Sequence, residues 1–321
     1  MAARSRDPEE LLGQARGGDR AALARLLSMV ERGGDDARTI SRLVYGLGGT
    51  AYTVGLTGAP GAGKSTLTSA LIGHLRAMRQ EVAVLAIDPT SPFSGGAILG
   101  DRVRMQDHAL DAGVFIRSMA TRGHLGGLSL ATPEAIRLLD AVGRQTVLVE
   151  TVGVGQVEVE IAGKADTTVV VVNPGWGDSV QANKAGLMEI ADVFVINKAD
   201  RKGVEETRRD LDLMLDLSDL SELGDWRPPI IATIAAENKG VAELWDAVTQ
   251  HRAHIEANGF LAKRRASRLR DELRHIVARR LEIRAREICT GDRWDQLARE
   301  VLDRSTDPWT AADEMLEGVG A

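Results

Sequence analysis

An α/β fold is predicted for this chain, with a mostly parallel sheet and helices on both of its faces. Between about residues 51 and 250, short β-branched runs alternate with helical stretches, and this alternation is typical of parallel sheets covered by helices. A glycine-rich stretch, GAPGAGKST at residues 58–66, follows one such run and precedes a helical one. We expect strands at 53–57, 82–87, 114–117, 146–150, 167–172, 193–197 and 230–234.

The composition is that of an ordinary globular chain. Of 321 residues, 44% are hydrophobic and 27% are charged, and no run approaches the roughly 18 to 20 apolar residues that a bilayer span requires. The basic N-terminus leads into Asp7-Pro8-Glu9-Glu10 instead of the apolar stretch of a signal peptide, and Cys289 is the single cysteine. A net charge of −6 does not favour nucleic-acid binding. We therefore expect a cytoplasmic protein that binds neither membrane nor nucleic acid.

Three parts are predicted along the chain. Residues 1–47 form an N-terminal helical extension of two short helices, separated by residues 33–36, with Asp19 as a candidate cap. Residues 48–254 form the α/β domain, and residues 255–321 form a helical C-terminal region. An apolar stripe marks this last region, made of Leu269, Leu273, Ile276, Val277, Leu281 and Ile288.

The stretch GAPGAGKST matches the phosphate-binding loop G-x-x-x-x-G-K-[ST] in the setting where the match is meaningful, after a strand and before a helix. Its glycines let backbone N–H groups wrap phosphates at a helix N-terminus. Lys64 reaches the β and γ phosphates, and Ser65 can ligate Mg²⁺. The expected nucleotide contacts are Gly58, Ala59, Pro60, Gly61, Ala62, Gly63, Lys64, Ser65 and Thr66.

Two carboxylates stand at strand ends that face the same crevice. Asp88 follows the strand expected at 82–87, and Glu150 ends the strand expected at 146–150. Both are predicted to face Mg²⁺ or its waters, directly or through water, and the turn at Gly153 can sense the γ-phosphate. The alternative is that either acidic residue caps a helix.

The motif Asn197-Lys198-Ala199-Asp200 closes the apolar run 193–196 and matches the guanine-recognition pattern N-K-x-D. Asp200 can accept hydrogen bonds from the N1–H and the exocyclic amine of guanine, Asn197 serves the O6/N7 edge, and the stem of Lys198 covers the ring. Adenine would leave the carboxylate of Asp200 without its partners, which is costly. The predicted nucleotide is therefore GTP, bound with Mg²⁺, and no tightly bound organic cofactor is expected.

A histidine pair and an arginine-rich segment could each indicate a binding function, but a structural role is favoured for both. His251 and His254 lie three apart on an expected helix, a spacing that could bind metal, but a solvated surface is favoured. The arginine-rich segment 263–286 could suggest RNA or an anionic membrane. Interleaved acidic residues beside the apolar stripe favour an amphipathic packing helix with one solvated face instead.

Together these motifs resemble the GTPases associated with methylmalonyl-CoA mutase, called MeaB or ArgK. The resemblance runs from near the N-terminus to about residue 250, and ETVGVGQ with ILGDRVRM is specific to the family. The matching stretches are GDRAALARLL at 18–27, TGAPGAGKST at 57–66, VAVLAIDPTS at 82–91, GGAILGDRVRM at 95–105, LVETVGVGQ at 148–156, PGWGDSVQANKAG at 174–186 and NKAD at 197–200.

The resemblance implies a signal-recognition-type P-loop GTPase fold, a homodimer formed through C-terminal helices, and a chaperone that loads and protects adenosylcobalamin in methylmalonyl-CoA mutase. The resemblance also implies that Asp101 lies with Asp88 and Glu150 near Mg²⁺. It implies that Lys64, Asp101 and Glu150 are the residues that support hydrolysis. The loop that carries Asp178 and Lys184 resembles a switch that senses the partner.

One departure from the usual GTPase pattern concerns the last guanine contact. Where S-A-x is common, this chain has Ala235-Ala236-Glu237, so a serine hydroxyl is missing while a backbone contact to O6 remains available. An alternative function is a P-loop phosphotransferase or ATPase linked to lysine/arginine/ornithine transport, as older labels of the family have it. The catalytic base, the source of a stimulating arginine, the dimer geometry and the mutase that is served stay open.

Overall fold

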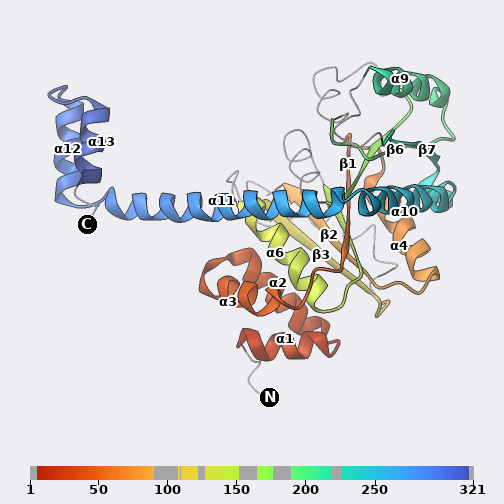
Figure 1. Ribbon diagram of the computed structural model, residues 1–321, viewed down its shortest axis with the longest axis horizontal. Helices are drawn as coiled ribbons and strands as arrows, with labels where there is room; N and C mark the ends of the chain where they lie inside the picture. The colour runs from red at the N-terminus through yellow and green to blue at the C-terminus, as the bar shows by residue number, and fades with distance from the viewer. Residues whose placement is uncertain are drawn as a thin grey trace. The chain divides into compact units, whose positions relative to one another are not determined.

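The structure is a computed structural model that describes residues 6–89, 108, 110–121, 127–151, 165–175, 189–217 and 226–317 (Figure 1). The chain forms two compact units, residues 1–268 and 269–321. Within the described ranges, no helix is both long enough and apolar enough to cross a membrane. The three-part division at residues 47 and 254 remains a prediction.

Seven parallel strands form one sheet in the order β3-β2-β4-β1-β5-β6-β7. The predicted α/β class is confirmed, and each expected strand is present. The strands are β1 (Tyr52–Gly58), β2 (Val82–Pro89), β3 (Val114–Thr121), β4 (Thr146–Thr151), β5 (Thr167–Val172), β6 (Val193–Asn197) and β7 (Ile230–Thr233).

The central strands are buried along their whole length, which explains their continuous apolar and β-branched sequences. Every residue of β1, β4, β5 and β6 is buried. Strands covered on both faces lose the alternation of apolar and polar residues that marks a half-exposed strand. Because all neighbours run parallel, the carboxyl ends of β1, β4, β5 and β6 meet at one edge of the sheet.

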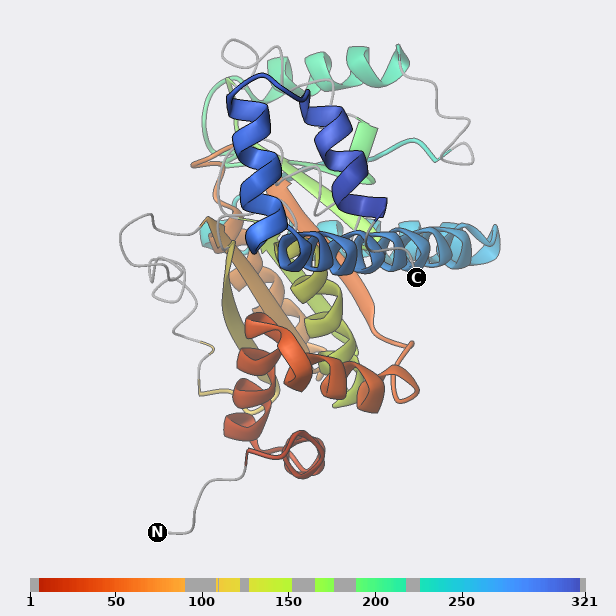
Figure 2. The ribbon, with the colours of Figure 1, turned by 90° about the vertical axis from the view of Figure 1, so that its left-hand side faces the viewer.

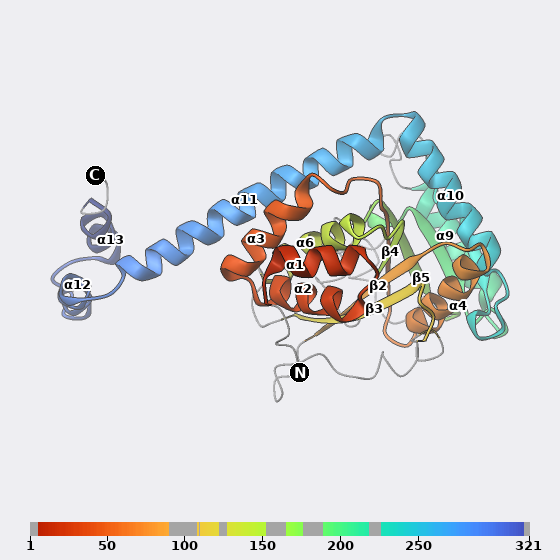
Figure 3. The same cartoon turned by 90° about the horizontal axis from the view of Figure 1, so that it is seen from below.

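Helices cover both faces of the sheet (Figure 3). On one face, α4 (Lys64–Ala77) and α10 (Val241–Ala257) pack their buried leucines against β1 and its neighbours. On the other face, α6 (Gly127–Ala141) packs against β2 and β4, and α9 (Val204–Asp216) packs against β5 and β6.

The N-terminal extension consists of three helices, not the two that the sequence predicted. They are α1 (Pro8–Arg16), α2 (Arg20–Arg32) and α3 (Gly34–Tyr45), and they share a hydrophobic core with α6, beside which they lie in Figure 2. At 9 residues, α1 is too short to show a clear helical period, although Asp7 caps it. The predicted cap of α2 is confirmed, because Asp19 accepts hydrogen bonds from the N–H groups of Ala21 and Ala22.

The C-terminal region is helical, as predicted. The long helix α11 (Phe260–Ile288) begins in the first unit and ends in the second, and it is followed by α12 (Asp292–Leu302) and α13 (Pro308–Glu317). Its predicted apolar stripe is open in a single chain, since Leu273 is 62% exposed and Leu281 61%. The expectation of a solvated arginine face is wrong at the start of α11, where Arg264, Arg265 and Arg268 are half-buried in ion pairs.

Candidate nucleotide-binding site

The phosphate-binding loop lies between the carboxyl end of β1 and the first turn of α4. Gly58, Gly61 and Gly63 have φ angles of 131°, 74° and 93°, a region that favours glycine. A Cβ atom on Gly58 would lie 2.0 Å from the carbonyl oxygen of Val171 in β5. Gly58 is therefore required by the close approach of β5 backbone, whereas Gly61 and Gly63 are favoured by their positive φ angles. The loop leads directly into the N-terminus of α4, a position suited to binding an anion.

Lys64 and Ser65 open α4 and are both buried. The ammonium group of Lys64 donates to the carbonyl oxygens of Gly58, at 2.5 Å, and Ala59, at 3.2 Å, which holds the lysine against the loop. The Oγ of Ser65 donates to Oε1 of Glu150 at 2.6 Å, and Glu150 is fully buried. Pairing of Leu56 with Glu150 across β1 and β4 places Glu150 beside the end of β1, from which the loop leads to Ser65. Two of the predicted magnesium ligands are thus adjacent.

Asn197 joins the guanine motif to the phosphate-binding loop. This buried side chain ends β6, and its Nδ2 donates to the carbonyl oxygen of Ala62 at 2.8 Å. Its Oδ1 accepts hydrogen bonds from Oγ1 of Thr233, at 3.1 Å, and from the N–H of Ala235, at 3.2 Å. An amide nitrogen has two N–H donors, and the predicted contact with the O6/N7 edge of guanine needs the one that Ala62 does not accept.

The rest of the base site surrounds this link. Lys198 has a φ of 60° and its Nζ donates to the carbonyl oxygen of Gly61 at 2.7 Å, so its stem extends from the base motif to the phosphate loop. Asp200 is exposed, which leaves its carboxylate accessible to a base. Ala235, Ala236 and Glu237 form a short 3₁₀ helix, η4. Glu237 pairs with Lys239 at 2.7 Å, and both side chains are more than half exposed.

Thr233 is a site residue that the sequence reasoning missed. It ends β7, and pairing of Asn197 with Thr233 between β6 and β7 brings its hydroxyl to the amide of Asn197. In the sequence, the position of Thr233 at the end of an expected strand was the feature that could have indicated a place in the site.

Several predicted residues cannot be placed. Asp101, Asp178 and Lys184 lie outside the described residues, and so does the side chain of Asp88. Their roles, and the individual roles assigned to the phosphate-loop and base residues, remain predictions.

The expectation of a solvated surface at the two histidines is wrong for His251. This side chain is 1% exposed, with Nδ1 2.7 Å from Oγ1 of Thr167 and Nε2 3.1 Å from Oδ1 of Asp192. The ring of His254 packs against Trp226, with centroids 5.2 Å apart. Helical spacing shows that two residues share a face but not whether that face is buried. Among the residues described, no group of three or more potential metal ligands occurs.

A phosphate-binding loop and a guanine motif, joined on a parallel sheet, define this protein as a P-loop GTPase. The family model for the methylmalonyl Co-A mutase-associated GTPase MeaB matches residues 23–289, and the chain belongs to this family.

Individual relatives agree with this assignment. A putative GTPase of Pyrococcus abyssi is 51% identical over 97% of this chain and 96% of its own, and the GTPase ArgK of Escherichia coli is 38% identical over 78% of each. The mouse methylmalonic aciduria type A homolog, a mitochondrial protein, is 35% identical over 83% of this chain and 65% of its own. A crystal structure of a LAO/AO transport system kinase superposes with a TM-score of 0.72 at 26% identity, covering 99% of both chains.

Two glycine substitutions test the link through Asn197. A Cβ on Gly63 would lie 2.4 Å from Nδ2 of Asn197, whereas a Cβ on Gly61, also at positive φ, meets nothing within 4 Å. Both Gly63→Ala and Gly61→Ala carry backbone strain, but only Gly63→Ala displaces the amide. We expect Gly63→Ala to bind GDP about tenfold more weakly than Gly61→Ala, measured by fluorescence titration. Equal losses in the two variants would show that Asn197 does not support the site.

Proposed function

We propose that this GTPase is a chaperone of adenosylcobalamin-dependent methylmalonyl-CoA mutase, which assists cofactor loading and protects or reactivates the mutase. The observation that carries the proposal is the family match over residues 23–289. The name of the mouse relative points to the same area of metabolism. The ordinary composition with a single cysteine fits the cytoplasm as the place of action.

Mg²⁺ is proposed to bind with GTP or GDP, and the described residues fit it. Ser65 and Glu150 place a hydroxyl and a carboxylate oxygen 2.6 Å apart beside the phosphate-binding loop, and oxygen is the ligand that Mg²⁺ prefers. Asp88 and Asp101 are proposed to complete the set. The bound ion would neutralise charge on the phosphate oxygens.

The protein's own contribution to hydrolysis is positioning and charge. The backbone N–H groups at the start of α4 hold the phosphates, and Lys64 supplies a positive charge to the β and γ oxygens. Its two carbonyl contacts already direct its ammonium group into the loop. Asp200 and the link through Asn197 hold the base, so the γ-phosphate is fixed relative to Glu150.

A homodimer through the C-terminal helices is also proposed. Large apolar side chains of the second unit are open to solvent in a single chain: Leu273, Leu281, Trp294, Leu302, Trp309 and Leu316. Exposed apolar surface of this kind marks association sites.

Sedimentation velocity at micromolar concentration should therefore show a dimer, and deletion of residues 289–321 should shift the protein toward monomer. A monomeric full-length chain would rule out this part of the proposal.

The partner proposal makes a prediction for Lys184. A nucleotide switch alters its partner only by binding it differently in its two states, and Asp178 and Lys184 are proposed to transmit that difference. Lys184→Ala should leave nucleotide affinity nearly intact yet reduce the stimulation of GTP hydrolysis by the mutase by about tenfold. Phosphate release with and without mutase measures this, with Lys263→Ala, an exposed residue of α11, as the control.

Two outcomes would contradict the partner proposal. One is a wild-type hydrolysis rate that the mutase does not change, together with cofactor retention by the mutase that does not depend on the GTPase. The other is transfer of labelled phosphate from the nucleotide to an amino acid or a protein, which would favour the phosphotransferase alternative suggested by the name of the solved LAO/AO kinase.

A further inference from the structure

Two buried aspartates stand at the amino ends of neighbouring strands, at the edge of the sheet opposite the nucleotide site. Asp166 directly precedes β5 and is 1% exposed, and Asp192 directly precedes β6 and is 3% exposed. An oxygen of Asp166 accepts a hydrogen bond from the N–H of Thr53 in β1, at 3.0 Å. An oxygen of Asp192 accepts one from the N–H of Thr168 in β5, at 2.8 Å. The two carboxylates therefore tie β1, β5 and β6 together.

Three arginines from the first turns of α11 bind these carboxylates, and we name the five residues the arginine–aspartate anchor. Arg265 donates to Asp166 through Nη2 at 2.6 Å and through Nε at 3.1 Å, and Arg268 also pairs with Asp166. Arg264 contacts both oxygens of Asp192, at 3.0 and 3.2 Å. Paired nitrogens on paired oxygens fix the orientation of a guanidinium group as well as its charge.

The carboxylates of the anchor are ionised. Burial raises the pKa of Asp166, but the hydrogen bond from Arg265 and the charges of Arg268 and Arg265 outweigh it and lower the pKa below its usual value. Burial likewise raises the pKa of Asp192, but its interactions with His251 and Arg264 outweigh burial and lower the pKa below its usual value. Loss of one arginine would leave a buried carboxylate with fewer partners, which is costly, so each pair resists separation.

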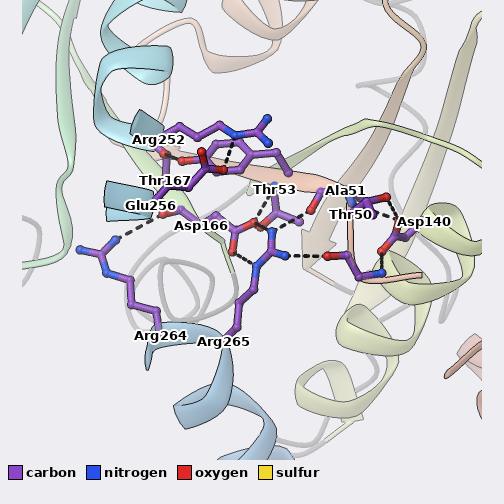
Figure 4. Close-up of polar contacts among 12 residues, drawn as sticks. Thr50, Ala51, Thr53, Asp140, Asp166, Thr167, Arg252, Glu256, Arg264 and Arg265 are labelled. Carbon is purple, nitrogen blue, oxygen red and sulfur yellow. Dashed lines mark hydrogen bonds and ion pairs between the residues drawn. The ribbon is translucent and has the colours of Figure 1, made fainter. Parts of the chain in front are cut away.

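Arg265 also binds the linker, residues 46–51, which joins the N-terminal helices to β1. It donates to the carbonyl oxygen of Gly49 at 2.9 Å. It also donates to the carbonyl oxygen of Ala51 at 2.8 Å (Figure 4). Asp140 of α6 holds the same linker, accepting from the N–H of Ala51 at 3.0 Å. The linker, the sheet and α11 thus meet at one side chain.

The strands tied by the anchor are the strands that carry the nucleotide site at their other ends. β1 ends at Gly58 in the phosphate-binding loop, and β6 ends at Asn197 in the guanine motif. Between them lies β5, whose Val171 carbonyl oxygen packs against Gly58. Each strand is a buried, hydrogen-bonded segment of about 20 Å. A shift at the nucleotide end therefore moves the end that α11 holds, since packed interiors deform little.

We propose that the arginine–aspartate anchor couples the nucleotide state of the site to α11, with Arg264, Arg265 and Arg268 as positioning residues. The proposal rests on the proposed function, in which the GDP and GTP states differ in conformation. Coupling is reciprocal: if GTP and GDP set α11 differently, release of α11 must change the relative affinity for the two nucleotides by the same factor.

The test compares two arginine variants on the same helix. Arg264→Gln/Arg265→Gln removes two of the three arginine charges of the anchor. Arg274→Gln removes an exposed arginine that pairs with Asp271, three residues before it on α11. Hydrogen exchange of residues 260–268 in wild type should differ about fivefold between GDP and a non-hydrolysable GTP analogue. The ratio of the two dissociation constants should shift about fivefold in the double variant, and less than about twofold in Arg274→Gln.

Two results would overturn the proposal: equal exchange of residues 260–268 in both nucleotide states of wild type, or an unchanged affinity ratio in a folded double variant. If the double variant does not fold, Arg265→Lys keeps the charge without the planar fork and should shift the ratio in the same direction by a smaller factor. A ratio equal to that of wild type would then overturn it. Failure of the mutase proposal is detected by a different measurement, the rate of GTP hydrolysis by wild type with and without mutase.

Discussion

The hydrogen bonds of Asn197 unite a nucleotide site whose two halves come from strands that are not neighbours. The phosphate-binding loop follows β1 and the guanine motif follows β6, with β5 between them. The amide of Asn197 reaches across to Ala62 and at the same time holds Ala235 and Thr233. One buried side chain thereby connects the phosphate-binding loop to the guanine motif. A Cβ atom on Gly63 would lie 2.4 Å from Nδ2 of Asn197, so a larger residue there would displace this amide.

The same three central strands organise both edges of the sheet. At their carboxyl ends the chain provides glycines, Lys64 and helix α4, a combination suited to phosphate. At their amino ends it provides two carboxylates that bind three arginines of α11. Ionised groups are costly inside a protein unless they are paired, so their presence at this edge restricts where the C-terminal helix can begin. The continuous apolar sequences of the strands connect the two edges through a rigid core.

Local patterns in the sequence predicted most of the fold and the polar centre of the site. The strands were visible because buried parallel strands are runs of β-branched residues, and the phosphate and guanine motifs depend on residue types at fixed spacing. The missing features depend on pairing across the chain. Thr233 joins the site through strand order, and Arg265 meets a carboxylate 99 residues away. Helical spacing likewise could not show that His251 faces the core.

A single site for a guanine nucleotide, carried by β1 and β6 together, is tested by calorimetric titration. Wild type and Asp200→Asn are titrated with GDP, ADP and xanthosine diphosphate in the presence of Mg²⁺. Wild type should bind GDP about a hundredfold or more tightly than ADP, because adenine leaves the carboxylate of Asp200 without its hydrogen bonds. Asp200→Asn should prefer xanthosine diphosphate, since its new amide donates to the oxygen that replaces the amine of guanine. Equal affinity of wild type for ADP and GDP, or an unchanged preference for GDP in Asp200→Asn, would contradict the account.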